Sequence, residues 1–317
     1  MPGADRPESA STAVRVSVVV ATNRSGPYLA EALASVAAQS RPVDELVVVD
    51  DGSPDPGAVR AILEEGPAAR LVRIEASGVC VARNRGVLET TGDLVVFLDD
   101  DDRWHPDRIR EHLRAMAASP AAVASYCGMR TIDGAGDELV AADQRPAPDR
   151  EAIVRGPGVM LPNLVLRRTV FDAVGGFDPA YRQGEDLDLV LKAAAHGPFA
   201  YVDATLVDYR YHATNTTRSF RALANSIRTI LRRHRAEAVA ARQGELVGAY
   251  DERLRANDRF AWWSAARSVR ACLRAHRWTT AAGDVWWVLR FAPSTPLLVL
   301  RDRVAEVVSG ARSGVAR

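Results

Sequence analysis

The amino-acid sequence predicts an α/β protein with a mainly parallel central sheet and a helical C-terminal extension. Two observations carry this prediction. Short runs rich in valine alternate with segments of helical periodicity up to about residue 217, and residues 218–317 are helix-like and basic. With 317 residues and 47% hydrophobic content, the chain can form one large or two modest globular domains.

The first part of the chain repeats a unit of strand, polar loop and helix. A β-branched run over 14–20 opens it, and Leu29, Leu33 and Val36 then recur at helical spacing. The later strands are expected at 45–50, 69–75, 93–98 and 163–168, and the later helices at 58–65, 82–86, after Pro106 and at 184–192. Gly92 is expected to end the helical pattern that begins at 82, and residues 126–162 are expected to form a loop containing a hairpin.

Four consecutive aspartates, Asp99 to Asp102, stand where the fourth expected strand leaves the sheet. Carboxylates so crowded repel one another unless a cation or hydrogen-bond donors offset the charge. Their oxygens suit Mg²⁺ or Mn²⁺, which bind through one or two carboxylates plus substrate phosphates. Asp50 and Asp51 end the second expected strand, and the carboxyl ends of parallel strands meet at one edge, so we expect a shared ligand site. The alternative for the four aspartates is a solvated acidic turn.

A second pair of acidic residues lies at the start of a later expected helix. Glu185 and Asp186 fall in the first turn, ahead of the apolar positions Leu187, Val190 and Leu191. The helix dipole favours ionised carboxylates there, and such a group can accept a proton from a substrate hydroxyl. The alternative is that both acids only cap the helix.

Several classes of protein are disfavoured. No Gly-x-Gly-x-x-Gly follows the first strand, which argues against a dinucleotide-binding fold of the usual kind. Cys80, Cys127 and Cys272 are odd in number and widely spaced, which favours a reducing compartment. Residues 1–13 read as a disordered lead-in without the apolar core of a signal peptide, so we expect a cytoplasmic protein.

Residues 218–317 differ from the rest of the chain in charge. They hold 19 basic against 8 acidic side chains, and five of the six tryptophans. The apolar stretch 285–300 is too short and interrupted for a membrane span, which needs ~20 apolar residues. Two alternatives stay open: a peripheral contact with the inner membrane face, or a helical subdomain that packs its tryptophans inward. No nucleic-acid partner is expected, because arginine affinity for phosphates is unspecific.

Taken together, the segments resemble the family 2 glycosyltransferases, whose catalytic domain has the nucleotide-sugar-binding GT-A fold. The matching stretches are 16–24, 28–39, 47–53, 78–86 with its Ala-Arg-Asn-x-Gly, 92–102, 175–178, 184–188 and 209–212. The resemblance covers roughly residues 14–212. Together with the composition and charge described above, it divides the chain into a lead-in over 1–13, a catalytic domain over 14–217 and a tryptophan-rich helical region over 218–317.

Carried over position by position, the resemblance assigns site residues. It implies donor binding by Thr22, Arg24, Asp50, Asp51, Arg83, Asn84, Asp99 and Asp100, metal binding by Asp101, Asp99 and His212, and catalysis by Asp186 with Glu185. Asp186 would be the general base. Thr22 stands where many relatives have a base-stacking tyrosine, and Leu187 where they often have tryptophan, so base recognition and the acceptor site are expected to differ.

The resemblance implies an inverting transfer that depends on Mn²⁺ or Mg²⁺. The donor would be a nucleotide-diphosphate sugar and the acceptor a saccharide, a lipid-linked molecule or a small molecule. Two alternatives remain: a nucleotidyltransferase, which would need a Gly-rich loop with a basic residue after the first strand, and a non-catalytic sugar- or lipid-binding module.

Overall fold

The computed structural model describes residues 13–156, 158–212 and 219–295. The chain divides into two compact units: unit 1 is 1–148 with 158–212, and unit 2 is 149–157 with 213–317. Residues 149–156 therefore belong with the C-terminal helices, whereas the sequence placed them in the 14–217 domain. All but the last residue of the expected lead-in lies outside the described residues.

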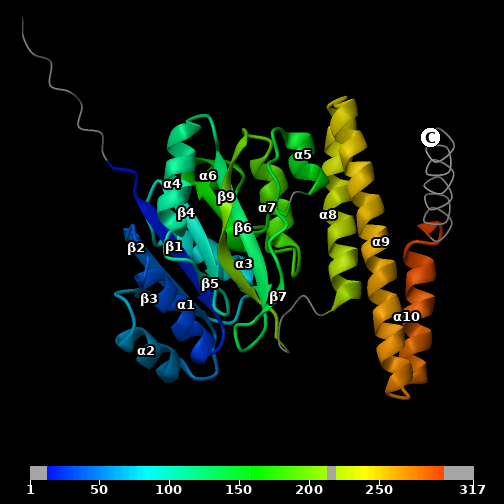
Figure 1. The fold of residues 1–317 in the computed structure, drawn as a ribbon, viewed down its shortest axis with the longest axis horizontal. Coiled ribbons are helices and arrows are strands. Elements are labelled where there is room, and N and C mark those ends of the chain that lie inside the picture. The colour runs from blue at the N-terminus through cyan, green and yellow to red at the C-terminus, as the bar shows by residue number, and fades with distance from the viewer. Residues whose placement is uncertain (1–12, 157, 213–218, 296–317) are drawn as a thin grey trace, which may run out of the picture. The chain divides into compact units, whose positions relative to one another are not determined.

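Unit 1 is built on one sheet with helices on both faces (Figure 1). Its strands are β1 (Val16–Thr22), β2 (Glu45–Asp51), β3 (Arg70–Ile74), β4 (Leu94–Asp99), β5 (Arg103–Trp104), β6 (Ala124–Ile132), β7 (Glu138–Val140), β8 (Leu164–Arg167) and β9 (Phe199–Arg210). Its helices are α1 (Pro27–Ala37), α2 (Pro56–Glu65), α3 (Val79–Leu88), α4 (Arg108–Ala118), the 3₁₀ turn η1 (Leu161–Asn163), α6 (Arg168–Ala173) and α7 (Glu185–Ala193).

The sheet has the strand order β3-β2-β1-β4-β8-β6-β9-β5, and β7 pairs with β6. The four strands β1 to β4 are parallel, as the alternating pattern predicts. Beyond β4 the sheet is mixed, because β8 enters antiparallel to both β4 and β6, while β6 and β9 are parallel.

Alternate strand residues face opposite helical layers, as the two-residue period of a strand requires. Val18 and Val20 of β1 pack in the core with α1, α2 and α4, and Val47 and Val49 of β2 pack with Ala82 of α3 on the other face. These strands are therefore buried on both sides, which explains their continuous valine runs.

The expected loop over 126–162 is wrong in its first part. Residues 126–132 continue β6, a nine-residue strand between β8 and β9, and the hairpin is formed by β6 with β7. This strand is hard to predict from the sequence because it contains polar residues and Gly128, although most of it is buried between neighbouring strands. The short helix α5 (Arg150–Arg155) occupies part of the remainder.

Helix α3 ends at Leu88, four residues before the expected stop at Gly92. Gly86 on this helix lies against the sheet: a Cβ there would come within 2.3 Å of Val19 Cγ1 and 3.1 Å of Val49 Cγ2. Glycine thus lets α3 approach β1 and β2 closely.

Unit 2 is helical, as the sequence predicts. It consists of α5, α8 (Phe220–Ala240), α9 (Gly244–Arg274) and α10 (Trp278–Phe291), and α9 packs against the other three helices (Figure 1). Its tryptophans divide into two groups. Trp262 and Trp287 pack against the unit's core, and Trp263, Trp278 and Trp286 are exposed.

The three cysteines are free and buried. Burial raises the pKa of Cys80 to about 11, and the nearby charge of Glu185 adds to the effect.

Candidate active site

The predicted site residues of the first strands meet at one edge of the sheet. β1 ends at Thr22, β2 at Asp51 and β4 at Asp99, and the register pairs Thr22 with Asp50 and Ala21 with Asp99. β2 and β4 lie on opposite sides of β1, so the chain order reverses at this strand. In open α/β sheets, ligands bind at the carboxyl ends of the strands beside such a reversal.

Thr22 and Arg24 hold the acidic run from the β1 side. Thr22 Oγ1 donates to Asp100 Oδ2 at 2.5 Å. Arg24 Nη2 lies 2.9 Å from Asp100 Oδ1 and 2.7 Å from Asp101 Oδ2. The guanidinium therefore supplies part of the positive charge that the four aspartates require.

His212 approaches the same carboxylate from the end of β9. Its Nε2 lies 2.9 Å from Asp101 Oδ2, and its ring stacks on Tyr28 with centroids 5.2 Å apart. Burial raises the pKa of Asp101, and the charges of Asp99 and Asp100 raise it further. The predicted metal pair Asp101 and His212 is thus brought into direct contact.

Arg210 also lies at this edge, and although it falls within the matching stretch 209–212, it was not predicted as a site residue. Its side chain is buried, its backbone N–H donates to Asp102 Oδ1 at 2.8 Å, and its Nε donates to the Asp101 carbonyl at 2.9 Å. Asp102 is completely buried, and this burial raises its pKa well above the usual range. Asp102 thus anchors the end of β9 at this edge of the sheet.

Arg83 joins the end of β4 to the start of α7. Its Nη2 donates to Asp99 Oδ1 at 2.6 Å and its Nη1 donates to Glu185 Oε1 at 2.8 Å. The guanidinium is only 6% exposed and lies 5.4 Å from the centroid of the Phe177 ring. This ion-pair bridge brings together two acidic signals separated by 86 positions in the sequence.

Asp186 lies beside this bridge, partly buried at the start of α7. Burial, the largest cause, and the charge of Glu185 raise its pKa, the Leu187 N–H, 2.8 Å from Oδ1, lowers it, and the net pKa is about 6. A carboxylate with a pKa near neutrality can both accept a proton and remain ionised at the pH of a cell.

Three residues that were predicted to bind the donor form hydrogen bonds or ion pairs within the protein. Asp50 accepts from the backbone and hydroxyl of Ser53 and pairs with Arg73. Asp51 accepts from two backbone N–H groups ahead of α3, and the Asn84 amide pairs with both backbone groups of Phe177, at 2.8 and 3.0 Å. Asp50 and Asp51 are at the predicted edge, and each carboxylate oxygen has a further lone pair for a ligand. The Asn84 amide orders the loop before α7.

The residues at this edge can supply a divalent cation with only a few of its ligands. Among the described residues no group of three acidic, histidine or cysteine side chains is arranged to hold a metal. Asp101 and His212 form a pair, and Mg²⁺ or Mn²⁺ bound to a nucleotide takes its other ligands from phosphates and water. Arg24 would have to release Asp101 Oδ2 for such an ion to bind.

The sheet of unit 1, with helices on both faces, has the GT-A type of α/β fold. The crystal structure of residues 1–349 of TarS from S. aureus superposes with a TM-score of 0.54, covering 84% of this chain and 89% of that one at 18% identity. This likeness supports the fold.

Sequence comparison names the family. Residues 17–173 match the profile described as Glycosyl transferase family 2. An uncharacterized glycosyltransferase of Rickettsia prowazekii is 26% identical over 214 residues, which are 64% of this chain and 65% of that protein. The succinoglycan biosynthesis protein ExoO of Rhizobium meliloti is 32% identical over 62% of this chain and 60% of its own length. Residues 17–173 of the chain therefore match glycosyltransferase family 2, and the chain spans somewhat less than two thirds of these relatives.

The family profile ends before α7, so Asp186 and His212 lie beyond it. None of the described helices has both the length and the apolar content that a membrane crossing requires.

Proposed function

We propose that the protein transfers a sugar from a nucleotide-diphosphate donor to an acceptor hydroxyl, with inversion at the anomeric carbon. The observation that carries this proposal is the Arg83 bridge, since it holds the acidic end of β4 and the first turn of α7 in one site. Relatives named for the biosynthesis of succinoglycan and teichuronic acid support a saccharide acceptor.

Asp186 is the proposed general base. Its carboxylate takes the proton of the acceptor hydroxyl as the hydroxyl oxygen forms a bond to the anomeric carbon. The bond from that carbon to the donor phosphate breaks on the opposite face, and nucleoside diphosphate leaves with the electron pair. The raised pKa supports this role, because a base of pKa about 6 holds the transferred proton better than an ordinary aspartate does.

Asp101 and His212 are the proposed ligands of Mn²⁺ or Mg²⁺, and Asp99 is proposed to lie nearer the nucleoside of the donor. The ion, when bound, would neutralise charge on the departing diphosphate. Arg24 has a related role in the proposal: once released from Asp101, its guanidinium can pair with a phosphate oxygen. Thr22 and Asp100 would keep the backbone of this loop in place.

The nucleotidyltransferase alternative gains no support from the loop after β1. Arg24 is the only basic residue between Ala21 and Gly26, and it binds two aspartates. The non-catalytic alternative is tested by the experiment below, because a binding module would release no nucleoside diphosphate.

The test is Asp186→Asn, measured against a panel of uridine, guanosine and thymidine diphosphate sugars. We expect nucleoside diphosphate release to fall about 10²- to 10⁴-fold, the usual effect of removing a general base. Donor affinity from calorimetry should be nearly unchanged, because the amide keeps the shape of the side chain.

The control is Glu64→Gln, which removes an exposed acid of α2 and should leave both quantities unchanged. Turnover of Asp186→Asn equal to that of the natural protein would contradict the base assignment. Absence of any nucleoside diphosphate release by the natural protein across the panel would contradict the proposed transfer.

A further inference from the structure

Helix α10 has an apolar side that the described residues of its own unit leave exposed. Its buried side packs on α9 and comprises Ala281, Asp284, Val288 and Phe291. Its outward side carries four large apolar residues, Trp278, Val285, Trp286 and Leu289, which are 62%, 43%, 62% and 48% exposed. We call these four residues the aromatic face of α10.

Helical geometry makes this face continuous. At 100° per residue, the four side chains fall within a sector of about 100°, opposite the buried side. A helix at the surface of a globular domain normally presents charged or polar residues there. Two tryptophans on such a side indicate a surface with a partner.

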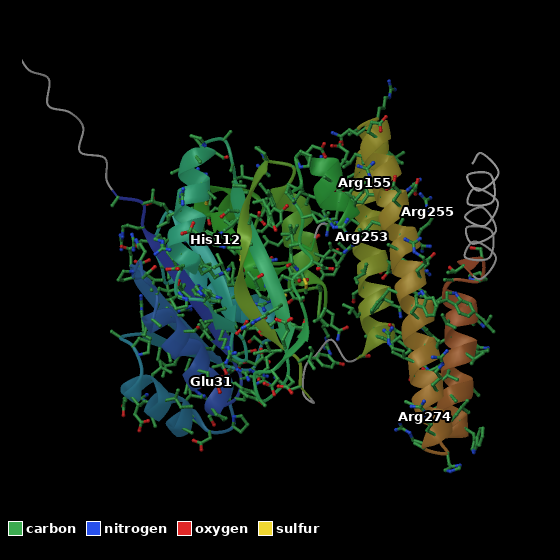
Figure 2. The ribbon with its side chains drawn as sticks, in the orientation of Figure 1. Glu31, His112, Arg155, Arg253, Arg255 and Arg274 are labelled. Carbon is green, nitrogen blue, oxygen red and sulfur yellow. The ribbon has the colours of Figure 1, made fainter. Side chains whose placement is uncertain are left out.

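The charges around this face are positive. Arg274, Arg277 and Arg290 are exposed and have no carboxylate partner among the described residues. The Arg290 guanidinium lies 4.6 Å from the centroid of the Trp286 ring, and Arg274 stands at the end of α9 where the chain turns toward α10 (Figure 2).

The single acid of α10 does not offset these charges. Asp284 is only 2% exposed, and it pairs with Arg221 of α8 while accepting from Ser268 of α9 at 2.7 Å. Within α10, the outward side therefore combines tryptophan, leucine and arginine without an exposed acid.

From this chemistry we propose that the aromatic face of α10 docks on a lipid bilayer that contains anionic headgroups. Tryptophan is favoured at the boundary between acyl chains and headgroups, where its ring is buried and its N–H stays wet. Arginines beside it can pair with lipid phosphates while their stems cover apolar surface. A second copy of the chain fits less well, because self-association through this face would bring like charges together.

This inference concerns α10 alone and does not depend on the proposed transfer. A variant that loses vesicle binding can still release nucleoside diphosphate from the donor, so failure of one proposal is distinguishable from failure of the other.

The test is co-sedimentation of the full chain with vesicles. One set is pure phosphatidylcholine, and the other has about a third of its lipid replaced by phosphatidylglycerol. We expect binding to the anionic vesicles, with a blue shift of tryptophan emission, and quenching of that emission when the acyl chains are brominated. Binding should weaken as salt rises, because salt screens the arginine charges.

Two double variants distinguish the contribution of the tryptophans from that of the arginines. Trp278→Ser with Trp286→Ser should reduce anionic-vesicle binding about tenfold or more, and Arg277→Gln with Arg290→Gln should reduce both the affinity and its salt dependence. The matched control is Leu88→Ser, which removes an 82% exposed leucine of α3 and should bind as the natural protein does.

Circular dichroism melting should show that the variants stay folded, because the altered side chains are exposed. The proposal is overturned if the full chain does not sediment with anionic vesicles, if the tryptophan pair variant binds undiminished, or if gel filtration shows a dimer that this variant abolishes.

Discussion

At the scale of single residues, the site depends on how charge is balanced. Crowding of Asp99 to Asp102 is tolerated because Arg24 and Arg83 supply positive charge. The same crowding together with burial raises the pKa of Asp101. For Asp186, burial is the largest cause of the pKa shift, and the resulting pKa is about 6.

This value predicts a pH dependence. The rate of transfer should rise with pH and level off above an apparent pKa of about 6, since only ionised Asp186 accepts the proton. The measurement is the initial rate of nucleoside diphosphate release across the acid-to-neutral range. The residual rate of Asp186→Asn should lack this step, and a step identical in both proteins would assign it to another group.

The same shift has a consequence for stability. A folded-state pKa raised above the ordinary 3.8 means that the folded protein binds the proton more tightly than the unfolded chain. The contribution of Asp186 to stability is therefore present below about pH 4 and is lost as pH rises through about 6.

At the scale of elements, close approach of α3 to the sheet supports the site, because α3 carries Arg83. Gly86→Ala would press a methyl group into Val19 and should lower the free energy of unfolding by about 1–3 kcal/mol. Chemical denaturation measures this loss. Gly57→Ala is the matched control in α2, where the nearest atom to the new Cβ is 3.4 Å away. Equal stability of the two variants would mean that α3 shifts without cost.

The elements also show what the sequence can predict. Valine runs identified β1, β2 and β4, because this signal is local and these strands are almost wholly buried. β3 is partly exposed, and its position was predicted from the alternation of strands and helices. β6 and β9 were missed: polar residues interrupt both, and their strand character comes from pairing with each other across more than seventy positions.

The same difference between local signals and long-range contacts applies to the site. The strand-end aspartates were predictable from their position, whereas the contact of Asp101 with His212 depends on β9 returning to that edge. Asn84 and Phe177, 93 positions apart, lie in two stretches that were each recognised, 78–86 and 175–178, but nothing in either stretch indicates that they contact each other.

At the scale of the whole molecule, ligand binding would join parts of unit 1 from both ends of its sequence. Thr22 and His212 lie at the beginning and end of this unit, and both bond to the acidic run. A donor nucleotide with Mn²⁺ should therefore raise the melting temperature, by an amount equivalent to about 2.7 kcal/mol at a hundredfold excess over Kd.

Asp101→Ala should abolish the part of this shift that requires Mn²⁺, and Glu64→Gln should retain it. Differential scanning fluorimetry with and without a chelator measures both. A shift that is the same in the Asp101→Ala protein would exclude this carboxylate as a metal ligand.

The burial of all three cysteines makes the natural chain convenient for spectroscopy. Maleimide reagents attack exposed thiolates, and buried thiols react slowly. One cysteine introduced at an exposed position such as Leu88 would thus give a single attachment point for a fluorophore, without removal of any native thiol.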